Sequence, residues 1–101
     1  MNLSFEQRAE IQLRSLHGAD QKQVTKAILT LNAMEPSAIS GNRKLYKILA
    51  PTDTPLYVFR GSPRLRLVLA IDGEDCKVVD IVDHDLLERL LPRPSRLSAT
   101  R

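Results

Sequence analysis

The sequence predicts an α+β domain, in which an N-terminal strand and a helical hairpin pack on an antiparallel β-sheet of three to four strands, followed by a short C-terminal helix. Two observations predict this fold class. Apolar residues recur every three or four positions in the first third of the chain, and at every second position from residue 56 onward. A chain of 101 residues has material for one hydrophobic core. We therefore expect a single domain over residues 1–91 and a mobile basic tail over residues 92–101.

The chain is expected to open with a short strand and a first helix. Leu3 and Phe5 alternate with polar residues, as in a strand with one buried face. Helical spacing then relates Ala9, Leu13 and Leu16. Gly18 follows this stripe, and glycine commonly ends a helix because it adopts the left-handed conformation without strain. We expect the first helix to end there.

A second helix is predicted directly after Gly18. Asp20 is expected to be its N-cap, and Gln23, three residues later, completes a capping-box pattern. Apolar residues then follow at the spacing i, i+3, i+4, i+7, namely Val24, Ala27, Ile28 and Leu31. Because the turn between the helices is so short, they must lie antiparallel and share one apolar face.

The second half of the chain has the pattern of a sheet. Pro36 and Gly41 break the helical pattern, residues 44–49 are ambiguous, and residues 50–55 form a second loop. Strands are expected over residues 56–60, 65–71 and 77–82. In the middle strand one face is apolar, with Leu65, Leu67, Leu69 and Ile71, and the other carries Arg64, Arg66, Val68 and Ala70.

The turn between the last two strands decides which face Asp80 occupies, because a slip of one residue moves every side chain to the other face. A two-residue loop would set Asp80 opposite Leu67 and bury its carboxylate. A three-residue loop within residues 72–75 instead aligns Val79 and Ile81 with the leucine face. We expect the three-residue loop. After the last strand, Asp83 or Asp85 is expected to cap a short helix over residues 86–91 that Pro92 stops.

Composition excludes several classes of protein. Cys76 is the only cysteine, so neither an intrachain disulfide nor a cysteine-based zinc site can form, and the two histidines are distant in sequence. No glycine-rich phosphate loop is present. We expect neither a metal nor a cofactor. No apolar run approaches the roughly 20 residues that span a membrane, so a cytoplasmic protein without a membrane partner is expected.

The charge is distributed unevenly along the chain, whose formal net charge is +3. Residues 72–88 hold one basic and seven acidic residues, whereas residues 43–66 hold six basic residues and one acidic residue. The six are Arg43, Lys44, Lys47, Arg60, Arg64 and Arg66. This middle segment is a candidate surface for a polyanion.

Arg60 and Arg66 are expected on the side of the sheet that the helices leave uncovered. Two interpretations of this placement stay open. Arg66 could pair with Asp80 across the strands, an exposed contact worth less than about 1 kcal/mol. Alternatively, several guanidinium groups on rigid strands suit phosphate, because each planar group binds two oxygens at once and stays charged.

Two segments carry a resemblance to a known family: "SFEQRAEIQLRSL" at residues 4–16 and "LYVFRGSPRLRLVLAIDGEDCKVVDIVDHD" at residues 56–85. Together with the order strand, helical hairpin and antiparallel strands, they make the chain resemble the RelE/ParE superfamily of bacterial type II toxins over about residues 3–87. Members typically open with a strand, a phenylalanine and a charged stretch like "FEQRA". They continue with a segment in which an arginine begins a central strand.

The resemblance implies a function. In the ribonuclease branch of this family the toxin cuts mRNA in the ribosomal A site, by attack of a ribose 2′-OH on the adjacent phosphate. Arg66 matches the arginine that begins the central strand and would stabilise the phosphorane, and Arg60 lies near basic positions of the preceding strand. His84 lies close to the family's terminal basic or histidine residue and is the candidate acid or base. RNA backbone would be held by Lys44, Lys47, Arg43 and Arg64.

The sequence also departs from the family pattern. No tyrosine follows the last strand, and the carboxylates of Asp83 and Asp85 stand where a phosphate site would prefer lysine or arginine. His84 could therefore simply begin a helix. Two alternatives to the ribonuclease stay open: a ParE-like inhibitor of DNA gyrase, and a non-catalytic module that binds nucleic acid or protein on the same scaffold. Expected partners are a cognate antitoxin, the ribosome with mRNA, and operator DNA through the antitoxin complex.

Overall fold

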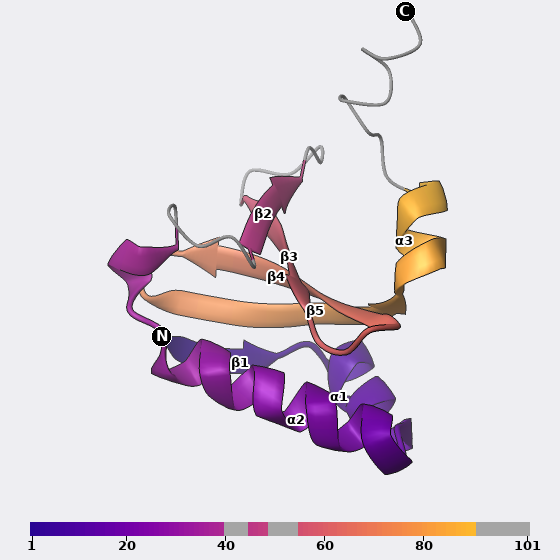
Figure 1. Ribbon diagram of the computed structural model, residues 1–101. Helices are drawn as coiled ribbons and strands as arrows, with labels where there is room; N and C mark the ends of the chain where they lie inside the picture. Colours follow the sequence, from indigo (N-terminus) through magenta and orange to yellow (C-terminus); the bar gives the residue numbers. More distant parts are fainter. Residues whose placement is uncertain (40–44, 49–54, 91–101) are drawn as a thin grey trace, which may run out of the picture.

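The structure is a computed structural model that describes residues 1–39, 45–48 and 55–90, with the last three of these given by their backbone alone. Two helices lie along one side of a five-stranded sheet, and a third, short helix follows the last strand (Figure 1). The elements in chain order are β1 (Asn2–Phe5), α1 (Gln7–Ser15), α2 (Gly18–Ala33), a 3-10 turn (Pro36–Ala38), β2 (Leu45–Ile48), β3 (Leu56–Arg60), β4 (Leu65–Asp72), β5 (Asp75–Asp83) and α3 (His84–Leu90). The predicted α+β class is confirmed.

The sheet has the strand order β1-β5-β4-β3-β2. Strand β1 pairs with β5 in parallel, and the other neighbours are antiparallel. The expected three to four strands become five, because the N-terminal strand joins the sheet at one edge and the ambiguous segment forms β2 at the other.

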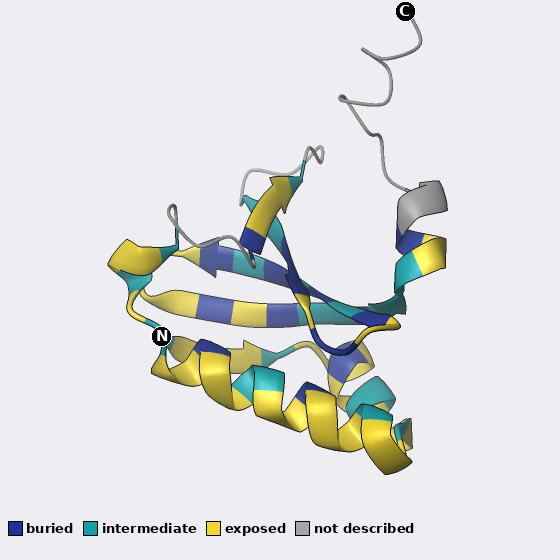
Figure 2. Cartoon of the chain, in the orientation of Figure 1, coloured by how far each residue is buried: buried dark blue, intermediate teal, exposed yellow. Residues whose placement is uncertain are grey.

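The hydrophobic core lies between the sheet and the two helices α1 and α2 (Figure 2). Alternate residues of β4 are buried on this side, as the sequence predicts. The core is formed mainly by Ala9, Val24, Leu31, Leu45, Phe59, Leu65, Leu67, Leu69, Ile71, Cys76, Val78 and Ile81. We call the opposite side of the sheet, which α1 and α2 do not cover, the open face. None of the helices in the described ranges is long and apolar enough to cross a membrane.

The boundary between the helices differs from the prediction. Helix α1 ends at Ser15, and Gly18, with a φ of +61°, begins α2 rather than ending α1. His17 occupies the N-cap position of α2. The prediction that Asp20 is the cap is therefore wrong: it lies in the first turn, and its carboxylate binds Arg64 instead. An acidic side chain is favourable in a first helical turn with or without a capping bond.

The turn between β4 and β5 also corrects the prediction. Asp72 pairs with Asp75, so the loop has two residues and not three, and Gly73 supplies the positive φ of +62° that such a turn needs. The register then shifts by one residue, because Leu69 pairs with Val78 whereas Val68 pairs with Asp80.

Val79 is therefore the extra residue of a β-bulge in β5. The bulge achieves what the longer loop was expected to do: it aligns Ile81 with Leu67 and keeps Asp80 out of the register position opposite that leucine. The expectation that Val79 also aligns with the leucines is wrong, since Val78 takes that place.

Helix α3 begins at His84, two residues before the expected start, and Asp83 is the one of the two predicted caps that the structure selects. Its carboxylate accepts a hydrogen bond of 2.9 Å from the backbone N–H of Asp85. Leu87 is buried and anchors the helix. The predicted helix stop at Pro92 and the predicted tail over residues 92–101 lie outside the described residues.

Candidate nucleic-acid interface

Two arginines face each other on the open face of the sheet. Arg60, the last residue of β3, lies directly opposite Arg66 of β4, and the same row continues to Val82 of β5. Like charges in directly opposite positions destabilise an antiparallel pair. Within the described part of the chain, neither guanidinium lies within ion-pair distance of a carboxylate. The pair therefore has positive charge available for an anion.

Arg66 is held in place by the turn between β3 and β4. Its Nη1 donates to the carbonyl oxygens of Ser62 at 2.8 Å, Leu65 at 3.0 Å and Pro63 at 3.4 Å. The side chain is half-buried, so these bonds satisfy one end of the guanidinium. They also fix its orientation. A fixed, charged donor suits an anion better than a mobile one, because less side-chain entropy is lost on binding.

The turn that holds Arg66 is itself rigid. The buried hydroxyl of Ser62 accepts hydrogen bonds from the backbone N–H groups of Leu65 at 3.0 Å and Arg64 at 3.3 Å. A Cβ atom at Gly61 would lie 3.3 Å from Val24 Cγ2 of α2, so the turn presses closely on the helix layer. The position of Arg66 is thus set by the core.

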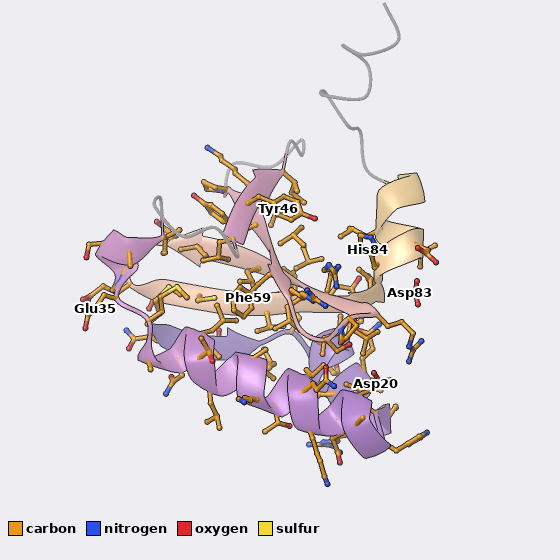
Figure 3. All side chains as sticks on the ribbon, viewed as in Figure 1. Asp20, Glu35, Tyr46, Phe59, Asp83 and His84 are labelled. Atoms are coloured by element: carbon orange, nitrogen blue, oxygen red, sulfur yellow. The ribbon has the colours of Figure 1, made fainter. Side chains whose placement is uncertain are left out.

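An aromatic residue shares this face. In register, Tyr46 of β2 lies opposite Val58, which lies opposite Val68, so all three are in the row next to the arginines. The Tyr46 side chain is 50% exposed. Figure 3 shows it on the side of the sheet away from α1 and α2. An exposed ring in the row next to two arginines is a combination that proteins use to bind single-stranded nucleic acid, since bases stack on rings and phosphates bind cations.

His84 stands at the end of β5, where α3 begins. Its backbone N–H donates to the Arg64 carbonyl oxygen at 2.7 Å, which ties it to the start of β4. The residue is half-buried, and Figure 3 shows it on the same side of the sheet as Tyr46. His84 follows Val82, the neighbour of Arg66, by two residues. The fold thus brings His84 to the end of the sheet that carries the arginine pair.

Arg64 lines a hollow together with His84, but its guanidinium is already paired with carboxylates. Its guanidinium binds the carboxylates of Asp20 in α2 at 2.6 Å and Asp83 at 3.5 Å. The hydrogen bond to Asp20, together with the charge of that carboxylate, raises the pKa of Arg64 above its ordinary value. The charge of Arg64 is therefore compensated within the protein, and its role in holding RNA stays a prediction. Likewise, Asp80 binds Arg8 at 3.4 Å, so the alternative in which it pairs with Arg66 is not observed.

Of the remaining predicted phosphate-binding residues, the structure describes Lys47, which lies away from the arginine pair. Lys47 lies opposite Tyr57 in register, which places it on the other face of the sheet from Tyr46. Arg43 and Lys44 lie outside the described residues. Sequence reasoning missed Tyr46, although a signal existed: in "LYKI" the buried Leu45 alternates with Tyr46 as in a strand. Within residues 1–39, 45–48 and 55–90, no group of three or more potential metal-ligating side chains comes together.

Comparisons with known proteins agree on the fold. The structure resembles the archaeal RelE-RelB complex from Pyrococcus horikoshii, with a TM-score of 0.61 and 17% identity over 81% of this chain and 92% of the other. It also resembles a YoeB/ParE toxin from Agrobacterium tumefaciens, with a TM-score of 0.61 and 12% identity over 83% and 99%. The RelB-RelE antitoxin-toxin complex from Methanococcus jannaschii gives a TM-score of 0.58 and 15% identity over 87% and 98%.

The sequence itself matches no protein-family model and no curated protein. Its relationship to known proteins is therefore visible in the fold and not in close sequence identity. The matched structures are covered almost completely, so the likeness concerns the whole domain and not a common fragment. The chain thus has the fold of the RelE/ParE superfamily, as the sequence resemblance predicts.

Proposed function

We propose that this protein is the toxin of a type II toxin–antitoxin system and that it cleaves mRNA in the manner of RelE. The observation that carries the proposal is the pair formed by Arg60 and Arg66 on the open face. Their opposed placement costs stability unless an anion lies between them. The resemblance suggests that this anion is a phosphate of RNA, because RelE-like ribonucleases act on such a phosphate.

The reaction would be an in-line transfer at one phosphate. The ribose 2′-OH loses its proton to a base and attacks the adjacent phosphorus, and the 5′-oxygen of the next nucleotide leaves with a proton from an acid. The products are a 2′,3′-cyclic phosphate and a 5′-hydroxyl end. Arg66 and Arg60 would stabilise the negative charge that develops on the phosphorane, in a position fixed before the substrate binds.

His84 is the proposed proton-transfer group. Asp80 also lies opposite Val68 in register, but its carboxylate binds Arg8. His84 and the Tyr46 hydroxyl are therefore the candidates on the described part of the open face, and imidazole both takes and gives protons near neutral pH. We assign the chemistry to His84 and a stacking role to Tyr46, since a half-exposed ring suits a base. Arg43, Lys44 and Lys47 remain candidates for holding RNA backbone.

The proposed partners follow from the same likeness. Two of the matched structures are complexes of RelE with RelB, and we propose that this chain likewise binds a cognate antitoxin. The ribosome with its mRNA would be the site of action, and operator DNA would be reached through the antitoxin complex. A cytoplasmic location agrees with these partners.

The test maps mRNA 5′ ends in a translating extract with and without the purified protein. We expect new ends within translated frames, which disappear with Arg66→Ala. Arg14→Ala is the matched control, because it removes the same charge from the exposed side of α1, where Arg14 pairs with Glu10. Unchanged mRNA with the wild-type protein would overturn the proposal. Damage to DNA in its place would favour gyrase inhibition, and harmless expression would favour a binding module.

A further inference from the structure

We infer that the hollow between α2 and the β3–β4 turn binds the nucleotide next to the reacting one, so that the RNA strand leaves the open face past Arg60 and Lys26. The inference rests on the proposed function and names the path of its substrate. It assigns a substrate contact to α2, a helix that sequence reasoning treated only as part of the core.

The hollow adjoins the arginine pair. It has a volume of about 510 Å³, and Arg60 lines it together with residues of α2. Arg60 thus belongs to both the open face and the hollow, because it also lies opposite Arg66. When the reacting phosphate of the RNA lies at the arginine pair, the next nucleotide therefore lies on the other side of Arg60.

The lining suits a nucleotide. Polar groups come from Gln23, Lys26 and Thr30 of α2, and apolar surface comes from Ala27 and Pro63. Small-molecule sites typically occupy about 300–1,000 Å³ and combine apolar walls with a few polar groups. A base would lie on the apolar surface, and its phosphate would lie between the two cationic side chains of Lys26 and Arg60.

Charge favours this exit over the opposite one. Among the described residues, no carboxylate lines the hollow beside α2. A second hollow of about 490 Å³ lies at the other end of the sheet, over β1, β5 and β4, and Glu6, Asp72 and Asp75 line it with Lys77. Lys77 is paired with Glu6 at 3.2 Å, so its charge is compensated. A polyanion on the open face is therefore attracted toward α2 and repelled from β1.

The test measures binding separately from cleavage. The probe is a single-stranded RNA of about ten nucleotides with 2′-O-methyl groups throughout, which has no 2′-OH to attack. Its affinity for the full chain is measured over a range of salt concentrations for the wild type, Lys26→Ala and Lys77→Ala. Both variants lose one exposed lysine, so they have the same net charge and differ only in where the charge is lost.

We expect Lys26→Ala to weaken binding about fivefold and to reduce the slope of log K against log salt by about 0.7, the value for one lost contact with a single strand. Lys77→Ala should stay within about twofold of the wild type. Equal behaviour of the two variants, with wild-type mRNA cleavage intact, would overturn the inference and leave the proposed function standing. Absence of cleavage by the wild type in the translating extract would remove the proposed function and this inference with it.

Discussion

Arg60 and Arg66 occupy directly opposite positions in β3 and β4, so two positive side chains meet on one face of the sheet. Arg66 is anchored by three backbone carbonyl groups and cannot simply turn away. The arrangement therefore places two positive charges on one face, where a bound anion would be favourable.

Binding of a divalent anion should accordingly stabilise the folded protein. We expect sulfate or phosphate to raise Tm beyond the effect of sodium chloride at equal ionic strength, because a ligand of the folded state alone shifts the unfolding equilibrium. For a domain of this size, a gain of about 1 kcal/mol raises Tm by about 4–8 °C. Differential scanning calorimetry measures the shift. With Arg66→Gln the specific gain should disappear, and an unchanged gain in that variant would show that the anion binds elsewhere.

Two substitutions at Tyr46 separate stacking from proton transfer. If the ring stacks on a base, Tyr46→Phe should keep cleavage within about threefold of the wild type, whereas Tyr46→Ala should lose about tenfold or more, since stacking is worth about 1–3 kcal/mol per base. Rates of mRNA cleavage in the translating extract provide the measurement. A large loss with Tyr46→Phe would instead assign a proton to the hydroxyl group, and His84 would lose that role.

Ser62→Ala should destabilise the protein by about 1–3 kcal/mol. The change removes the hydroxyl that accepts hydrogen bonds from the backbone N–H groups of Arg64 and Leu65, and leaves these donors without their partner at a buried position. Urea unfolding measures the free energy of unfolding of the wild type and of the variant. Ser15→Ala is the control, because the exposed Ser15 hydroxyl only donates to the Ile11 carbonyl oxygen within α1, and it should change stability by less than about 0.5 kcal/mol. Similar losses in both variants would contradict the role given to Ser62.

Stability should fall at high pH because of Cys76. Burial raises the pKa of its thiol from 9.0 to about 11. Between these values the unfolded chain releases the proton and the folded chain keeps it, so the unfolded state binds fewer protons and the free energy of unfolding decreases as pH rises. Below pH 9 the thiol is protonated in both states, so its contribution to the free energy of unfolding is fully present. Urea unfolding at several pH values tests this, and Cys76→Ala should show a flatter profile across the same interval.

The reactivity of the same thiol gives a second readout. The thiolate is the reactive form, so native Cys76 should react with iodoacetamide at pH 8 much more slowly than the unfolded chain does. Mass spectrometry counts the modified fraction. Equal rates in the native and unfolded states would mean that the thiol is not held in the core.

The sequence predicts most of the fold because its apolar pattern is regular. Strand β3 begins and ends at the predicted residues, and the alternate leucines of β4 are buried as expected. The turn was mispredicted because two devices give nearly the same register: a three-residue loop, or a two-residue loop with a bulge at Val79. The sequence pattern does not distinguish the two arrangements, because β5 has the same register against β4 beyond Val79 in both. The three-dimensional structure is needed to choose between them.

The candidate site was harder to predict than the fold. Arg60 and Arg66 follow from strand alternation, and the structure places them opposite each other. Arg64 has the same type of side chain, but its role depends on Asp20, a residue 44 positions away in sequence. Tyr46 joins the face only through the pairing of β2 with β3, and the pattern of that short segment fits a helix as well as a strand. Contacts distant in sequence were thus the ones that pattern alone did not reveal.

The parallel pairing of β1 with β5 has a consequence for synthesis of the protein. The Asn2 side chain donates a hydrogen bond to Asp75, 73 residues later, so the first of the described strands pairs with the last. Contacts this distant in sequence slow folding, because a long loop must close before they form. A growing chain cannot assemble this sheet until β5 has left the ribosome. A protein proposed to attack translating ribosomes would therefore be harmless to the one that makes it until β5 has emerged.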